Sequence, residues 1–376
     1  MFAEYSIYNS VIMLFIVLYS FGLDKIFGAK YYKSNYSKAI LNEAFLFNLF
    51  NFTIIFIIVI VLYPFSGDFM SRYSLSINLI IVILINALVV SLNSLLFIKY
   101  QIKSEGKNYF GFLFIKQATF LLLVIMFINQ QSSVIQIFLF DIIANVFISI
   151  IYYFQNHKIK VRFHVFKLKI NPYYYKIGYP LLISELGIWI MQNSERVIVA
   201  TYGDLSQVSA ITISNNLIQG LRIAINGLII KIVPDIYNII KKHNNILKNK
   251  LFVKYLAYFN IFLVLTLTTI CFLYENIIVL LSNEKYLHTQ VIIILFSVAF
   301  AFNINFTILS NYLVYKNKTK LIAIILTTSG VFSLLTNLIL IKDLGLLTVG
   351  IAQVISSLLA LILVLFSIKS ISKRLI

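Results

Sequence analysis

Apolar runs of about 20 residues recur from one end of this sequence to the other. A helix needs about 20 apolar residues to cross the ~30 Å hydrocarbon core of a bilayer. Of the 376 residues, 60% are hydrophobic and only 12% are charged, whereas soluble domains carry about a quarter charged residues. The sequence therefore predicts an all-α polytopic membrane protein. We expect about eleven transmembrane helices, at residues 7–23, 44–63, 75–98, 109–129, 133–154, 177–200, 206–232, 252–274, 289–314, 321–341 and 346–368.

The distribution of positive charge predicts the orientation of the chain. If loops alternate across the membrane, one set of loops and the C-terminal tail hold most of the Lys and Arg residues. The other set holds only Arg72, Lys285 and Lys342. The positive-inside rule places the Lys-rich set in the cytoplasm, which predicts an outside N-terminus and a cytoplasmic C-terminus. Anionic lipid of the inner leaflet accounts for the net charge of +18, so nucleic acid is not expected as a partner.

The longest cytoplasmic connection divides the chain into two predicted lobes. This linker, residues 156–176, is basic and contains the turn signal Asn171-Pro172. It separates an N-terminal lobe of five helices, 1–155, from a C-terminal lobe of six helices, 177–376. Many transporter folds consist of two equal repeats, so the division predicts that one helix is absent, through a start upstream of Met1 or a shortened gene. A natural eleven-helix protein is the alternative.

Polar side chains follow one face of two consecutive predicted helices. Spacings of four, three and four residues keep each set within one helical stripe. The sets are Glu185, Trp189, Gln192 and Arg196 on the first helix, and Asn215, Gln219, Arg222 and Asn226 on the second. We interpret the two stripes as one hydrated surface lined by amides and cations. The alternative is that these groups only join helices, through hydrogen bonds of about 0.6 kcal/mol each.

Three charged residues are predicted at similar depth in the membrane. Lys116, Glu185 and Arg222 each lie nine residues from the nearest cytoplasmic Lys, or about 13 Å at about 1.5 Å per residue. Charges at this depth are costly and usually face a bundle interior or a wet cavity. Because Glu185 and Arg222 lie on consecutive antiparallel helices, we expect that they can pair directly, while Lys116 comes from the other lobe.

Other polar residues have two interpretations. Asp141 lies eight residues into a helix that enters from outside, where it is either a proton carrier or a buried structural acid. Glu195 is predicted to form a local interfacial ion pair with Arg196. Isolated asparagines are interpreted as helix-packing residues, with a cavity role as the alternative; they include Asn86, Asn93 and Asn303.

The sequence offers little to build a metal or nucleotide site. Its four histidines lie in predicted loops and its single cysteine, Cys271, lies in an apolar span, so no thiolate cage and no histidine cluster is expected. No Gly-Lys-Ser or Gly-Lys-Thr phosphate loop follows a strand. We therefore expect no cofactor, no metal and no enzymatic activity.

Several stretches resemble the polysaccharide flippase family, the Wzx-type or O-antigen transporters. This family belongs to the superfamily that also holds multidrug and toxic-compound extruders. The match covers nearly the whole chain through degenerate, hydrophobic motifs. The matching stretches are 4–8, 21–24 and 31–33, which resemble the second family helix and its loop; 178–182 with 193–196, which resemble the seventh; and 312–320, 337–341 and 345–352, which resemble the last three. Aligned in this way, the chain lacks the first family helix.

The resemblance implies two six-helix lobes that move by alternating access in the bacterial inner membrane. The implied cargo is an undecaprenyl-pyrophosphate-linked oligosaccharide for O-antigen, lipopolysaccharide or capsule, and glycan polymerases are the implied partners. Arg offers planar, multidentate donors for a pyrophosphate. On this basis we predict a substrate path of Arg222, Lys116, Arg196, Gln192, Gln219, Asn215 and Asn226, with Arg196 near the exit. Glu185 and Asp141 are predicted to couple transport to H⁺ or Na⁺.

Two other functions remain as alternatives. A multidrug or small-cation antiporter of the same superfamily would favour an acidic cavity, whereas the predicted interior has more cations than acids. An O-antigen polymerase or ligase resembles this chain in hydropathy but carries a long outside loop with Arg and His. The outside loops predicted here are short.

Overall fold

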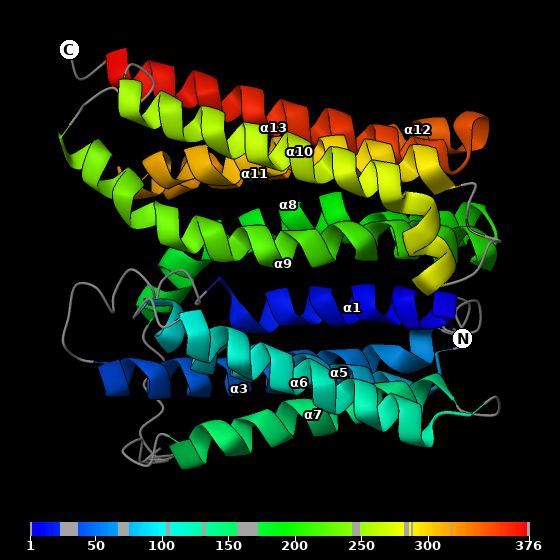
Figure 1. The fold of residues 1–376 in the computed structure, drawn as a ribbon. Coiled ribbons are helices and arrows are strands. Elements are labelled where there is room, and N and C mark those ends of the chain that lie inside the picture. The colour runs from blue at the N-terminus through cyan, green and yellow to red at the C-terminus, as the bar shows by residue number, and fades with distance from the viewer. Residues whose placement is uncertain are drawn as a thin grey trace. The chain divides into compact units, whose positions relative to one another are not determined.

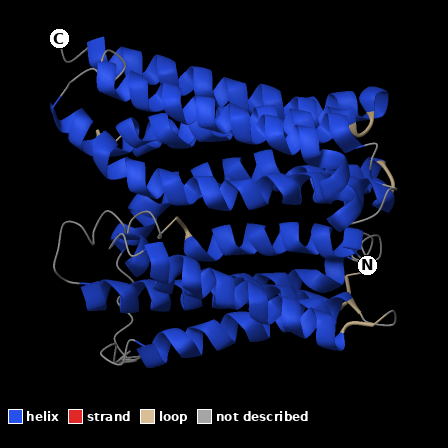
Figure 2. Ribbon diagram, in the orientation of Figure 1, coloured by secondary structure: helices blue, strands red, loops and turns tan. Residues whose placement is uncertain are grey.

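The computed structural model describes most of the chain. The described residues are 2–22, 37–66, 75–102, 106–129, 133–155, 172–242, 249–281, 286, 289–316 and 318–373. Within these residues every regular element is a helix (Figure 2), and the chain divides into two compact units, Met1–Leu182 and Ile183–Ile376.

The described part of the chain contains eleven α-helices and one short 3-10 helix (Figure 1). The first unit holds α1 (Phe2–Ser20), α3 (Ser37–Leu62), η1 (Tyr63–Ser66), α5 (Ile77–Ile102), α6 (Gly106–Phe127) and α7 (Val134–Gln155). The helix α8 (Pro172–Tyr202) contains the boundary between the units. The second unit continues with α9 (Leu205–Lys242), α10 (Lys250–Leu281), α11 (Gln290–Tyr315), α12 (Thr319–Leu344) and α13 (Leu347–Lys373).

These eleven helices confirm the predicted fold class. Nine of the described helices are long and apolar enough to cross a membrane by length and composition, and α8 and α9 are not among the nine. These two helices carry the polar stripes that the sequence predicted. The described part of the chain is all-helical, and the protein is a multi-pass membrane protein.

The sequence predicted the existence of the helices more accurately than it predicted the residues at which they begin and end. α8 begins at Pro172, within the predicted linker, and α9 continues ten residues beyond the predicted end at Ile232. Proline is favoured at a first helical position because its missing N–H would have no partner there. Hydropathy detects only the part of a helix that lies in hydrocarbon, so polar helical turns at the ends were missed. Linker residues 156–171 lie outside the described residues.

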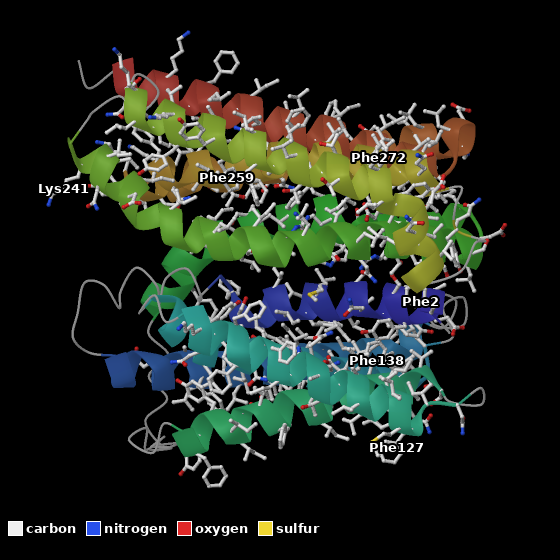
Figure 3. All side chains as sticks on the ribbon, in the orientation of Figure 1. Phe2, Phe127, Phe138, Lys241, Phe259 and Phe272 are labelled. Carbon is white, nitrogen blue, oxygen red and sulfur yellow. The ribbon has the colours of Figure 1, made fainter. Side chains whose placement is uncertain are left out.

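The surface is apolar in the way that a lipid-facing protein requires. Phe272 is 91% exposed, whereas Phe138 is 1% exposed (Figure 3). The exposed set also includes Phe114, Ile125 and Met126 of α6. Exposed apolar areas of this extent are unfavourable in water and favourable against acyl chains.

Each unit is organised around one central helix. In the first unit, α5 packs against α1, α3, α6 and α7; in the second, α11 packs against α9, α10, α12 and α13. α6 also packs against α7, as α12 packs against α13. The order of packing therefore repeats when α1, α3, α5, α6 and α7 are matched with α9 to α13. This repeat leaves α8, the helix in which the unit boundary lies.

The N-terminal turns of α8 pack within the first unit. The ring of Tyr175 lies 4.9 Å from that of Phe47, and its hydroxyl donates a hydrogen bond to Asn51 Oδ1 at 3.3 Å. Gly22 has a φ of +67°, and a Cβ at this position would meet Leu181 at 2.5 Å. Only glycine combines this backbone conformation with so close an approach.

The later turns of α8 pack within the second unit, against α12. A Cβ on Gly187 would lie 2.7 Å from the Leu326 carbonyl oxygen, and a Cβ on Gly330 would lie 2.7 Å from the Gly187 oxygen. Thr327 Oγ1 donates a hydrogen bond to the Ile183 oxygen at 3.3 Å. Small residues let the backbones of membrane helices approach closely, so this crossing fixes α8 against the second unit.

Candidate functional site

The polar stripes of α8 and α9 meet at Arg222. Its Nη1 donates a hydrogen bond to Gln192 Oε1 at 2.9 Å. The Arg222 Cζ lies 5.6 Å from the ring centroid of Phe300 on α11, within cation–π range. The two predicted polar faces are therefore in contact at this pair of residues, as both interpretations of the stripes require.

Arg222 lines a cavity of about 220 Å³ within the second unit. Among the described residues that line it, Arg222 is the charged one, and Asn303 and Thr307 of α11 add polar groups. The wall is otherwise formed by Ile188, Gln192, Phe300, Ile304, Phe306 and Leu326. The site therefore has one cation, several neutral polar groups and an apolar wall. The sequence suggested a packing role for Asn303, with a cavity role as the alternative, and in the structure Asn303 lines the cavity.

Glu195 is a buried acid beside this cavity-lining arginine. It is 1% exposed, and its Oε2 accepts a hydrogen bond from Gln353 Nε2 of α13 at 2.6 Å. Its carboxylate interacts electrostatically with both Arg196 and Arg222. Arg196 is also buried, at 5% exposure. The sequence predicted a local interfacial ion pair with Arg196, whereas both side chains are buried. It gave no sign of the contact with Gln353, which lies 158 residues away in the sequence.

The described neighbours of Arg222 include Gln192 and Glu195. The direct pairing of Arg222 with Glu185, which the sequence allowed, stays a prediction. The helices α8 and α9 extend beyond Lys176 and Lys231, the residues from which the depths of Glu185 and Arg222 were counted.

The other predicted residues of the stripes occupy different surroundings. Asn215 is 4% exposed, and its Nδ2 has no hydrogen-bond partner in the described structure. An unsatisfied buried donor costs about 1–3 kcal/mol. Gln219 and Glu185 are half-buried. Asn226 lies in α9, but its side chain is outside the described structure.

A second polar cluster lies in the first unit. Lys116 Nζ of α6 lies 3.7 Å from Asp141 Oδ1 of α7, and the two side chains are 20% and 23% exposed. Asn86 Nδ2 of α5 donates a hydrogen bond to Asp141 Oδ2, and Asn145 Nδ2 donates one to Asp141 Oδ1, both at 3.1 Å. Three helices thus contribute to one carboxylate. The sequence identified both charged residues but did not pair them.

The amide network extends toward the other end of α7. Asn93 Nδ2 of α5 donates hydrogen bonds to the Asn145 backbone oxygen at 2.9 Å and to Asn145 Oδ1 at 3.1 Å. Ser149 Oγ donates to Asn93 Oδ1 at 2.5 Å. Asn86 and Asn93 therefore hold α5 against α7, in agreement with their interpretation as packing residues.

Within the described residues, no group of three or more His, Cys, Asp or Glu side chains is arranged to hold a metal ion. The carboxylate of Asp141 instead has amide and ammonium neighbours.

The fold has counterparts among solved transporters. A multidrug resistance MATE family transporter of the MOP superfamily matches in its outward-facing conformation with a TM-score of 0.70 and 15% identity, over 99% of this chain and 88% of that one. Its inward-facing form gives 0.71 and 14%, over 99% and 91%. A MOP superfamily transporter from Pyrococcus furiosus gives 0.64 and 14%, over 99% and 86%.

Sequence comparison gives no further relative. The chain matches no protein-family model and no curated protein. At 12–15% identity the structural matches establish the fold. This chain is therefore a multi-pass membrane protein with the fold of the MATE transporters of the MOP superfamily.

Proposed function

We propose that this protein is a lipid-linked oligosaccharide flippase. It would move undecaprenyl-pyrophosphate-linked repeat units of O-antigen or capsule across the bacterial inner membrane by alternating access. The observation that carries the proposal is the cavity of the second unit, whose charged lining residue is Arg222. The MATE-like fold and the resemblance to polysaccharide flippases support it.

The chemistry of the cavity suits an amphipathic anion. A pyrophosphate must cross hydrocarbon with its negative charge balanced, and a guanidinium offers several planar donors to phosphate oxygens. One Arg222 donor is directed at Gln192, which orients the group, while Asn303 and Thr307 supply polar contacts. The apolar wall is compatible with a lipid-linked substrate.

Each predicted site residue keeps a proposed role. Arg222 is the anion anchor, Lys116 is a second cation for the headgroup, and Glu185 and Asp141 couple the cycle to H⁺ or Na⁺. The remaining substrate-path residues are Arg196, Gln192, Gln219, Asn215 and Asn226. Glycan polymerases are the proposed partners, because they consume the translocated repeat units.

A multidrug antiporter is the second candidate, and a specific finding favours it. Two of the matching structures are described as a multidrug resistance transporter. For the Pyrococcus furiosus transporter, a reversed polarity of the binding pocket is described as suggesting a different function. In the present chain, Arg222 in the cavity wall would repel a cationic drug, and this supports an anionic substrate.

The orientation of the chain is part of the proposal. The Lys-rich connections are placed in the cytoplasm by the positive-inside rule, so the N-terminus is outside and the C-terminus is cytoplasmic. A lipid-linked substrate made on the cytoplasmic face would then meet the protein on the side where its loops are most basic.

The proposal can be tested by measuring surface glycan in a strain that lacks the gene for this protein and carries a plasmid copy of the wild type or a variant. Wild-type protein should restore the glycan, Arg222→Ala should restore it poorly, and Arg222→Lys should restore part of it because the charge remains without the planar donors. Lys254→Ala is the matched control, since Lys254 is an exposed cation on α10. Full glycan with Arg222→Ala at wild-type protein levels would remove Arg222 from the mechanism. Altered drug susceptibility with unchanged glycan would favour the antiporter.

A further inference from the structure

The strongest unassigned feature is a group of lysines at one end of the second unit. Lys316 is the C-cap of α11, Lys318 is the N-cap of α12, and Lys320 lies in the first turn of α12. The Lys318 N–H donates a hydrogen bond to the Leu313 oxygen at 2.8 Å. This bond fixes the turn between the two helices, so three ammonium groups are carried by one short, ordered turn.

A fourth lysine lies at the same end of the unit. The consecutive helices α12 and α13 pack against each other as a hairpin. Lys320 lies 24 residues before the end of α12, and Lys369 lies 22 residues after the beginning of α13. At about 1.5 Å per residue, the two residues lie within about 3 Å of the same level. We call Lys316, Lys318, Lys320 and Lys369 the lysine rim.

The positive charge of the lysine rim exceeds the negative charge around it. Three of its lysines are exposed, and Lys316 is half-buried with its Nζ 6.0 Å from the ring centroid of Tyr312. Among the described residues at this end of the second unit, the acid is Asp235 of α9. The described charged residues at the opposite end of the same helices are Asp204, Glu275, Lys342 and Asp343. The lysine rim is therefore suited to an anionic ligand.

Exposed apolar side chains lie one helical turn from the lysine rim. Ile324, four residues after Lys320 on α12, is 60% exposed, and Phe366, three residues before Lys369 on α13, is 66% exposed. These spacings keep each apolar side chain on the same helical face as its lysine. A ligand along this surface meets cations at one level and apolar side chains at the next, which matches a phospholipid headgroup and its acyl chains.

We propose that the lysine rim, with Ile324 and Phe366, is a binding site for an anionic phospholipid such as phosphatidylglycerol. The phosphodiester lies against the ammonium groups, and the acyl chains lie along α12 and α13. Basic surfaces between membrane helices on the cytoplasmic side bind anionic headgroups, and the lysine rim belongs to the connections expected in the cytoplasm. The bound lipid joins α13 to the end of α11, the central helix of the unit, and stabilises the unit. This inference does not rest on the proposed transport activity.

Binding of phosphatidylglycerol to the purified, delipidated full chain tests the inference. The thermal midpoint should rise with added phosphatidylglycerol and reach a plateau, and phosphatidylcholine should raise it much less. Each Lys near an anionic lipid surface strengthens association about fivefold. The triple variant Lys316→Gln, Lys318→Gln and Lys320→Gln should therefore bind phosphatidylglycerol about 100-fold more weakly. If this variant does not fold, Lys318→Gln alone replaces it, with an expected loss of about fivefold.

A second triple variant is the matched control for charge. Lys107→Gln, Lys250→Gln and Lys254→Gln together remove the same charge from exposed positions on α6 and α10. This variant should bind phosphatidylglycerol as the wild type does, because its substitutions lie outside the lysine rim.

The apolar part of the site has its own pair of variants. Phe366→Asn should weaken phosphatidylglycerol binding although all four lysines remain. Ile339→Asn changes a residue of α12 that is similarly exposed, at 68%, but lies toward the other end of the helix, and it should change nothing. Glycerol 3-phosphate, which has the charge without acyl chains, should not raise the thermal midpoint.

The site is overturned if the two triple variants lose affinity to the same extent, since the whole positive surface would then attract the lipid. It is also overturned if phosphatidylcholine is as effective as phosphatidylglycerol, or if glycerol 3-phosphate reproduces the rise in the midpoint. Failure of the flippase proposal is separate, because it appears as full glycan with Arg222→Ala while phosphatidylglycerol binding is unchanged.

Discussion

Arg222 and Gln192 are joined by a hydrogen bond of 2.9 Å between neighbouring helices of the second unit. The amide oxygen accepts from the guanidinium without cancelling its charge. Gln192 therefore orients Arg222 in the cavity and leaves it positive.

This geometry predicts that anion binding needs a hydrogen-bond acceptor at position 192 that carries no negative charge. Gln192→Leu removes the acceptor, and loss of a hydrogen bond to a charged group costs about 1.5–3 kcal/mol, so pyrophosphate affinity should fall by about 10- to 150-fold. Gln192→Glu places a carboxylate against Arg222 and should abolish binding and surface glycan. Gln290→Glu makes the same change at an exposed residue of α11 and should be silent. Equal activity of Gln192→Glu and the wild type would contradict the anion site.

The hydrogen bond between Glu195 and Gln353 predicts that swapping the two side chains restores the stability that each single substitution loses. Glu195→Gln removes the negative charge that lies near Arg196 and Arg222. Removal of one partner of a buried charge pair lowers the free energy of unfolding by about 3–5 kcal/mol. Gln353→Glu puts two carboxylates together and should also lower the thermal midpoint of the purified protein. The double variant restores one acid and one amide, so it should recover most of the lost stability. A double variant less stable than both single variants would exclude the direct contact.

The glycine crossing of α8 and α12 predicts a steric effect. Gly187→Ala would place a Cβ 2.7 Å from the Leu326 backbone, and overpacking of this kind costs about 1–3 kcal/mol. Its thermal midpoint in detergent should fall. Gly220→Ala is the control, because a Cβ there meets nothing within 4 Å. That change should be neutral or stabilise α9 by about 0.5–1 kcal/mol. Equal midpoints for the two variants would mean that α8 and α12 do not cross so closely.

A reciprocal amide pair joins α10 and α11. Asn260 Nδ2 donates to Asn305 Oδ1 at 3.0 Å, and Asn305 Nδ2 donates to Asn260 Oδ1 at 2.7 Å. Replacing either residue with Leu leaves the other amide without its partner. Double-mutant cycles on membrane helices give about 0.6 kcal/mol on average and up to about 1.7. The double Leu variant should therefore cost less stability than the two single variants added together, and strict additivity would argue against the pair.

The proposed orientation can be tested on a background without cysteine, since Cys271→Ser removes the only native thiol. Lys318 lies at the turn between α11 and α12, and Asp343 lies near the end of α12; both residues are exposed. Each is replaced in turn, as Lys318→Cys or Asp343→Cys. A membrane-impermeant thiol reagent added to intact cells should label Asp343→Cys. It should label Lys318→Cys only after permeabilisation, because the Lys-rich turn is expected in the cytoplasm. The reverse pattern would invert the topology.

The sequence by itself determined the helices and the residues that share a helical face. Each of the eleven predicted spans overlaps one described α-helix, because the bilayer demands long helical runs, but the predicted ends missed turns such as those at Pro172 and at the end of α10. The four, three, four spacing placed Gln192 and Arg222 on facing stripes, since helical periodicity is fixed by backbone geometry alone.

Tertiary structure decided which of these residues meet. Arg222 contacts Gln192, Lys116 contacts Asp141, and Glu195 accepts a hydrogen bond from Gln353 far along the chain. Such pairings depend on the axial offset and rotation of one helix against another. Those quantities are set by close packing, including glycine crossings that no single helix encodes, so periodicity can name the face of a helix but not its partner.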